Sequence, residues 1–142
     1  MAIVTMDSGV ASIFKAYFNN VWAAGGKNLT LRLFVNNYTP LDTSTAGSFT
    51  EASGGGYAAK TLTNGSWTES NVAGIEQAAY AQQTWTFSGP LSGSATIYGY
   101  YVTDADGMAI YAETQLPFTP GSSGLDQYVV PASYQGSKGT PG

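Results

Sequence analysis

The chain has 142 residues, with no histidine, no cysteine, five basic and nine acidic residues, and a net charge of −4. Charged residues make up 10% of the chain, against about 25% in a typical soluble domain. Nucleic acids and anionic membranes attract proteins mainly through basic residues, so the composition disfavours both as partners. The missing histidine and cysteine also remove the usual neutral-pH base and soft nucleophile, so we expect a protein that acts through its surface and not through catalysis.

The length fits one domain, and we expect a single β-sandwich domain over residues 1–134. Residues 135–142 (QGSKGTPG) have the composition of a flexible tail. No apolar run approaches the roughly 20 residues that a transmembrane helix needs. The first residues lack the basic and apolar blocks of a signal peptide, so we expect a protein made in a cytoplasm.

One amphipathic helix is predicted at about residues 8–24. Asp7 and Ser8 are good N-cap residues, and Gly25-Gly26 is typical of a helix end. Apolar side chains recur between them at steps of three and four: Val10, Ile13, Phe14, Tyr17, Phe18, Val21 and Trp22. We expect this stripe to cover the chain's own sheet, with a neighbouring subunit as the alternative.

The following segment predicts strands interrupted by turns. Residues 29–35 alternate between apolar and other side chains, which is typical of a half-buried strand. A loop is predicted from Thr39-Pro40 to about Ser48, followed by a short strand at 49–52. Gly54-Gly55-Gly56 then breaks the chain.

A hairpin is predicted around Asn64-Gly65, because this dipeptide favours tight turns between strands. Its strands would be residues 57–63 and 66–69. Residues 70–79 show no clear period and are expected to form a loop. Residues 80–88 predict another strand, with Trp85 and Phe87 on one face.

The most β-rich stretch predicts a long hairpin. Residues 95–103 and 108–113 flank Asp104-Ala-Asp-Gly107, which suits the tip. Residues 116–120 contain two prolines, which suits an edge strand or a crossing, and 125–132 would be the last strand. Together these elements predict a mainly β fold, an antiparallel β-sandwich or jelly-roll-like barrel with one N-terminal amphipathic helix.

Catalytic and metal sites find little support in the spacing of residues. Asp104-Ala-Asp-Gly107 begins like a calcium loop, but the twelfth position is Gln115 where a glutamate is needed. No spacing selects a pair of carboxylates for glycoside hydrolysis, and the serines have no histidine to activate them. We therefore expect no catalytic residues, no cofactor and no metal.

Tyrosines are concentrated on the strand at 95–103. Simple alternation puts Tyr98 and Tyr100 on one face and Tyr101 on the other. The exposed face would then be a protein interface, since tyrosine is favoured there. Two alternatives stay open, namely an aromatic ladder within the sheet and a stacking surface for sugars.

The order of these segments resembles small virion structural proteins of tailed bacteriophages, over about residues 5–132. The N-terminal helix and the following stretches carry the resemblance: 28–40 (NLTLRLFVNNYTP), 49–57 (FTEASGGGY), 58–62 (AAKTL), 80–87 (YAQQTWTF), 97–102 (IYGYYV), 104–107 (DADG) and 116–120 (LPFTP). It implies a non-enzymatic virion component, made in the cytoplasm of a bacterial host. A capsid cement or decoration protein, which bridges capsomers on the outside of the head, is the expected role.

The resemblance implies that the partners are the major capsid protein and further copies of this chain. The candidate interface residues are Trp22, Tyr38, Leu41, Tyr98, Tyr100 and Tyr134. Two other roles remain open. One is a tail, baseplate or fibre component, including a receptor- or glycan-binding module, and the other is a wall hydrolase.

Overall fold

The computed structural model describes residues 28–41, 43–131 and 133–136. The helix predicted at about 8–24 lies outside these residues, as does Trp22. Contacts divide the chain into two compact units. We call Leu29–Thr61 with Gln82–Val130 the core unit, and the described residues of the other unit, which include Leu62–Ala81, the hairpin unit. The single domain over 1–134 stays a prediction.

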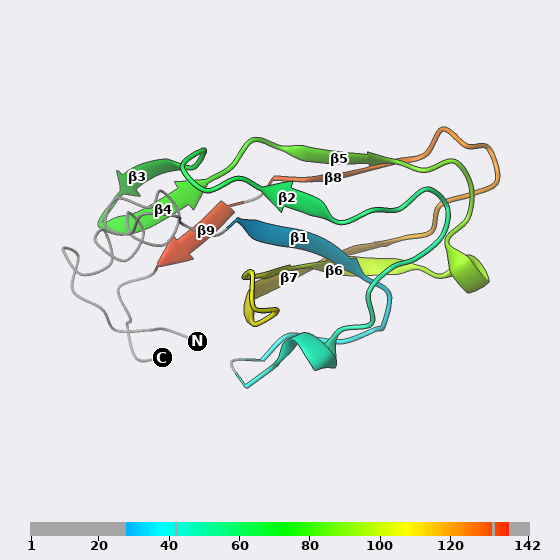
Figure 1. Ribbon diagram of the computed structural model, residues 1–142, viewed down its shortest axis with the longest axis horizontal. Coiled ribbons are helices and arrows are strands. Elements are labelled where there is room, and N and C mark those ends of the chain that lie inside the picture. The colour runs from blue at the N-terminus through cyan, green and yellow to red at the C-terminus, as the bar shows by residue number, and fades with distance from the viewer. Residues whose placement is uncertain (1–27, 42, 132, 137–142) are drawn as a thin grey trace. The chain divides into compact units, whose positions relative to one another are not determined.

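The core unit contains two sheets. The four-stranded sheet has the order β2-β1-β6-β7, in which β1, β6 and β7 pair antiparallel, and β5 pairs antiparallel with β8 in the other sheet. Figure 1 shows β5 and β8 as a layer separate from β1, β6 and β7. The strands are β1 (Leu29–Phe34), β2 (Lys60–Leu62, ending in the hairpin unit), β5 (Gln83–Thr86), β6 (Ile97–Thr103), β7 (Ala109–Phe118) and β8 (Gln127–Val130).

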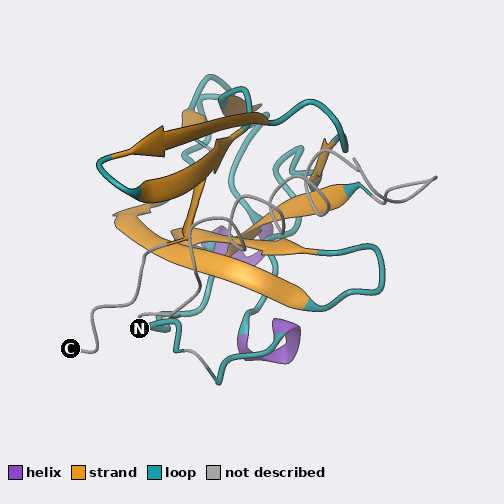
Figure 2. Cartoon of the chain, turned by 90° about the vertical axis from the view of Figure 1, so that its left-hand side faces the viewer, coloured by secondary structure: helices purple, strands orange, loops and turns teal. Residues whose placement is uncertain are grey.

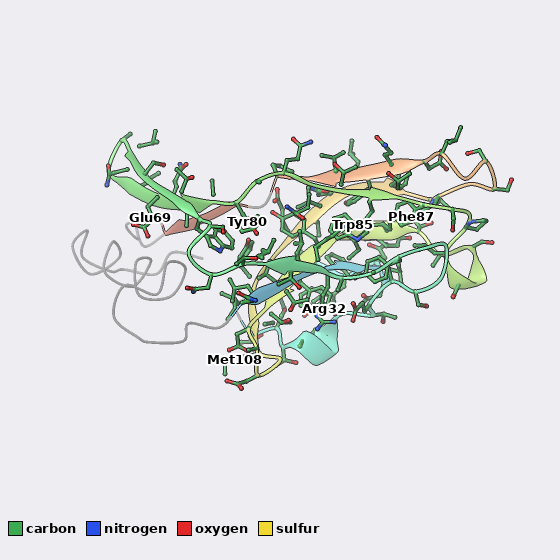
Figure 3. All side chains as sticks on the ribbon, turned by 45° about the horizontal axis from the view of Figure 1, so that its top comes forward. Arg32, Glu69, Tyr80, Trp85, Phe87 and Met108 are labelled. Atoms are coloured by element: carbon green, nitrogen blue, oxygen red, sulfur yellow. The ribbon has the colours of Figure 1, made fainter. Side chains whose placement is uncertain are left out.

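Aromatic side chains join the two sheets of the core unit. Phe118 on β7 lies 5.6 Å from Tyr128 on β8 and 6.3 Å from Phe87, measured between ring centroids. On β5, Trp85 stacks on Tyr57, and its indole nitrogen donates a hydrogen bond of 2.7 Å to the carbonyl of Ala58. Trp85 on β5 and Phe87 just after it, which were predicted to share one face, are both almost fully buried (Figure 3). The alternation in the sequence therefore identified the buried faces of these strands.

The hairpin unit contains one antiparallel sheet in the order β3-β4-β9. Its strands are β3 (Thr68–Val72), β4 (Ile75–Ala79) and β9 (Ser133–Gly136). The turn between β3 and β4 has positive φ at both Ala73 (51°) and Gly74 (80°). This is the backbone form that favours two-residue hairpins, although alanine rarely adopts it.

Two predictions about this region are wrong. Asn64-Gly65 forms a turn, but β2 and β3 on either side of it belong to different sheets, so no hairpin forms there. The hairpin lies instead at residues 68–79, most of which (70–79) was expected to be a loop. Periodicity does not predict this hairpin, because β3 is polar and mostly exposed and therefore lacks an apolar period.

The first two residues of the expected C-terminal tail belong to a strand. Gln135 and Gly136 belong to β9 and pair with Gln77 and Glu76 of β4. Backbone hydrogen bonds to a neighbouring strand do not depend on side-chain composition, so a Gly- and Ser-rich segment can still complete a sheet. The remaining tail, residues 137–142, lies outside the described residues.

The coarse fold class is confirmed, whereas the strand expected at 125–132 is not the last one, since β9 follows β8. The fold is mainly β with antiparallel sheets, and the described strands close into no barrel. The long hairpin forms from β6 and β7, and β7 continues through Pro117 because it is an edge strand. The strand expected at 49–52 is reduced to an isolated bridge between Phe34 and Glu51. Within the described ranges, no helix is long and apolar enough to span a membrane.

Candidate functional site

A loop of residues 36–48 follows β1 and is held by its own hydrogen bonds. The Ser44 hydroxyl accepts from the Leu41 backbone N–H at 2.8 Å and lies 2.7 Å from the Tyr38 hydroxyl. The Ser44 N–H in turn donates to the Leu41 carbonyl at 3.0 Å. We call this segment the braced loop, since one serine ties its turn to an aromatic side chain near its start.

Asn36 closes the base of the braced loop. Its side-chain amide donates to the carbonyl of Ser48 at 2.9 Å, and its side-chain oxygen accepts from the N–H of Thr50 at 2.8 Å. Between them, Ala46–Ser48 form a short 3₁₀ turn, η1, closed by the Ser48 N–H on the Thr45 carbonyl. The two ends of the loop are therefore fixed to each other by one side chain.

An aromatic cluster anchors the braced loop to the sheet. Phe49 is 7% exposed, and its ring stacks on that of Tyr101 at 4.6 Å and 13°. It also lies 5.1 Å from the ring of Phe34 and meets the ring of Tyr38 edge-on at 5.6 Å. Because Phe34 is on β1 and Tyr101 on β6, the loop is packed against two strands of the four-stranded sheet.

A polar network lies beside this cluster. Arg32 forms an ion pair of 2.7 Å with Glu51, which also accepts a hydrogen bond of 2.9 Å from the Tyr57 hydroxyl. Arg32 donates further to the Thr103 hydroxyl at 3.3 Å, and the Tyr57 oxygen accepts from the N–H of Leu33. Burial is the main cause that raises the pKa of Tyr57 above its usual value. The network fixes the segment after the loop to β1.

The braced loop presents an exposed apolar side chain. Leu41 is 60% exposed, and Tyr38 next to it is half-buried. The described side chains of the loop carry no charge, and Asp42 lies outside the described residues. In Figures 1 and 2 the turn η1 stands away from the strands of the core unit. A surface of this kind is inexpensive to desolvate, which suits contact with another protein.

The structure brings together some of the predicted interface residues and separates others. Tyr38 and Leu41 lie on the braced loop, and half-buried Tyr98 packs against the aromatic cluster at its base. Tyr100 is 1% exposed and therefore offers no surface to a partner. Tyr134 lies on β9 with its side chain outside the description.

The arrangement of tyrosines on β6 differs from simple alternation. Tyr98 packs with the cluster that contains Tyr101, while the hydroxyl of Tyr100 donates to Glu113 on β7. The register of β6 against β7 shifts between Ile97 and Gly99. An irregular ladder changes the direction of side chains near it, so period-two counting fails here.

Sequence reasoning missed the residues that brace the loop. Asn36 and Ser44 are small polar residues of a kind that bonds to nearby backbone and stabilises turns. That propensity was the available signal, although it does not reveal which partner each residue finds. Phe49 was assigned to a strand, and its role as the anchor depends on contacts with distant residues.

The Asp104–Gly107 segment forms the turn of the β6–β7 hairpin. One side-chain oxygen of Asp104 accepts from the N–H groups of Asp106 at 2.9 Å and Met108 at 2.8 Å. This oxygen is therefore used by the turn itself. Among the described residues, no three acidic side chains gather in a way that could hold a metal ion.

Comparison with known proteins adds no family or function. No family model matches the chain, and no curated protein or solved structure shows significant similarity to it.

Proposed function

We propose that the protein is a non-enzymatic structural subunit of a phage virion, a capsid cement protein that contacts its neighbours through the braced loop. The fold proposed for the whole domain is an antiparallel sandwich with the amphipathic helix at its N-terminus. The observation that supports this function best is the exposed Leu41 on a loop already fixed in one conformation. The resemblance to virion proteins supports a contact within a phage particle, and the head is the location that we propose.

Pre-organisation of the loop favours binding. A flexible loop must lose conformational freedom when it docks, whereas a loop fixed by Ser44 and Asn36 has already done so. Full burial of a leucine side chain contributes about 1.5–3 kcal/mol. Because Leu41 is 60% exposed, its burial against a partner would add roughly 1–2 kcal/mol per copy. Many such contacts acting together on one shell stabilise it far more than any single contact.

The proposed partners are the major capsid protein and further copies of this chain. The net charge of −4 favours a position on the outer surface of a head, away from packaged DNA.

The proposal is tested on heads that lack the protein. Such heads should release their DNA at a lower temperature than complete heads, and added wild-type protein should restore the original value. Leu41→Asp should bind poorly and fail to restore it, because it places a charge in the contact. Leu125→Asp is the matched control, since Leu125 is 80% exposed elsewhere in the core unit.

Two results would overturn the proposal. One is the presence of the chain in purified tails and its absence from purified heads, which would assign it to the tail, baseplate or fibre. The other is full restoration of head stability by Leu41→Asp.

A further inference from the structure

An open depression of about 500 Å³ lies on the core unit at the end of β7. Residues 113–118 and Tyr128 line it. Ile97 pairs with Phe118 and Gly99 with Thr114, so residues 115–117 of β7 lie opposite Tyr98 alone. This bulge sits on the edge strand of the sheet. Bulges at sheet edges redirect side chains and are common beside binding sites.

A carboxylate is held in place at one side of the depression. The Tyr100 hydroxyl donates to Glu113 Oε2 at 2.6 Å, which fixes the orientation of the carboxylate. Among the described residues, Glu113 Oε1 has no hydrogen-bond donor, and the side chain is exposed. An oriented, exposed carboxylate oxygen is a strong acceptor for a ligand hydroxyl.

Tyr128 lines the same depression with a buried side chain. Tyr128 is 7% exposed, and its hydroxyl has no hydrogen-bond partner within the described part of the chain. Burial, and after it the charge of Glu113, raises the pKa of Tyr128 to about 12. The hydroxyl oxygen is closed to solvent, so Tyr128 contributes to the wall of the depression and offers no hydrogen bond to a ligand.

The rest of the lining is aromatic and neutral. The half-buried ring of Phe118 makes tilted contacts with the rings of Tyr128 and Phe87, 5.6 and 6.3 Å away. Thr114 and Gln115 add neutral donors and acceptors, and no lining residue is basic. The lining therefore disfavours anions. It combines apolar surface with several hydrogen-bonding groups. A sugar ring needs both, because it has an apolar C–H face and hydroxyl groups around its edge.

We propose that this depression is a binding site for a neutral carbohydrate. Glu113 accepts hydrogen bonds from adjacent sugar hydroxyls, while the C–H face of the ring packs on Phe118 and exposed Leu116. The shallow, open form suits one or two sugar units of a longer glycan. The proposal is independent of the braced loop and adds a ligand to a protein whose proposed role is structural.

Nuclear magnetic resonance titration of the full chain tests this site. The probes are glucose, galactose, mannose, rhamnose and N-acetylglucosamine, each added separately, and tetramethylammonium as a cationic probe. At least one sugar should shift the amide signals of residues 113–116, 118 and 128 in a saturable way, since Pro117 has no amide N–H. Glu113→Gln should weaken that binding about tenfold or more, because it removes a charged acceptor.

Three further variants make the test specific. Phe118→Leu keeps apolar bulk without the ring and should also weaken sugar binding. Asp106→Asn removes one charge from the tip of the β6–β7 hairpin and should leave binding unchanged. Leu41→Asp should also bind sugar normally, so failure of this site and failure of the proposed assembly role are distinguishable.

The proposal is overturned if no sugar shifts these signals, if the shifts lie elsewhere, or if tetramethylammonium alone produces them. The last result would identify a cation site formed by a carboxylate and aromatic rings. Retention of the dispersed amide spectrum by Glu113→Gln and Phe118→Leu establishes that each variant is folded. Unchanged affinity in both folded variants would equally exclude the depression as the sugar site.

Discussion

Replacing Phe49 tests whether the aromatic cluster fixes the braced loop to the sheet. The ring is 7% exposed and has three aromatic neighbours, with centroids 4.6, 5.1 and 5.6 Å away. Phe49→Ala removes these contacts and leaves a cavity, which typically costs 3–5 kcal/mol. Phe49→Leu keeps most of the apolar volume and should cost about 1–2 kcal/mol, because aromatic pairs contribute beyond their buried area.

Urea unfolding followed by tryptophan fluorescence measures these losses. Leu125→Ala is the control, because Leu125 is 80% exposed and a surface change should stay within about 0.5 kcal/mol. Amide hydrogen exchange adds a second readout: residues 43–48 should exchange faster in Phe49→Ala, with β1 and β6 less affected. A loss below about 1 kcal/mol for Phe49→Ala would refute the view that this ring is a central packing element.

Three further predictions concern stability. Burial raises the pKa of Tyr57, Tyr100 and Tyr128 above 10, so unfolded tyrosines lose protons first as the pH rises. The free energy of unfolding should be unchanged below about pH 10 and fall towards pH 12, by about 1.4 kcal/mol per pH unit for each tyrosine still protonated in the folded state. Urea unfolding measures this fall, and a midpoint that stays constant from pH 10 to pH 12 contradicts the prediction. Gly99→Ala should lower stability by about 1–3 kcal/mol, because the added carbon would clash with the Glu113 carbonyl and lie 2.8 Å from the Phe34 ring. Thermal unfolding measures this loss, with Gly89→Ala, whose added carbon meets open space, as the control. Equal melting temperatures for the two variants would disprove the clash. Asn36→Ala removes both bonds that close the braced loop and should cost about 1–2 kcal/mol, with faster hydrogen exchange in the loop; unaltered exchange would show that Asn36 does not brace it.

Much of the core unit was predictable because its strands alternate. Leu29, Leu31 and Leu33 identified the buried face of β1, and the Asp-Gly turn located the β6–β7 hairpin. In both places a local pattern and the tertiary structure agree. Where they agree, the secondary structure of a segment can be predicted from its sequence.

The hairpin unit was less predictable because its strands are formed by backbone pairing without an apolar period. β3 is polar and mostly exposed, and its turn uses Ala73 at positive φ. β9 is a short strand that pairs with β4 across more than fifty residues of sequence. Propensity and periodicity give little information about a partner so distant.

The candidate sites were only partly predictable for a related reason. Leu41 and Tyr38 were chosen as interface candidates, and the structure places both on the braced loop. Tyr100 was taken for a surface residue, yet its hydroxyl is used by Glu113 across the β6–β7 ladder. The bulge that forms the depression depends on the register between those two strands, which the sequence does not show.

The most direct test of the central claim is an electron-microscopy reconstruction of the assembled particle that contains this chain. We predict that the chain lies on the outer surface of the head and that Leu41 and Tyr38 of the braced loop are buried against a neighbouring subunit. A chain located in the tail, or a braced loop that faces solvent in the assembled head, would contradict the account.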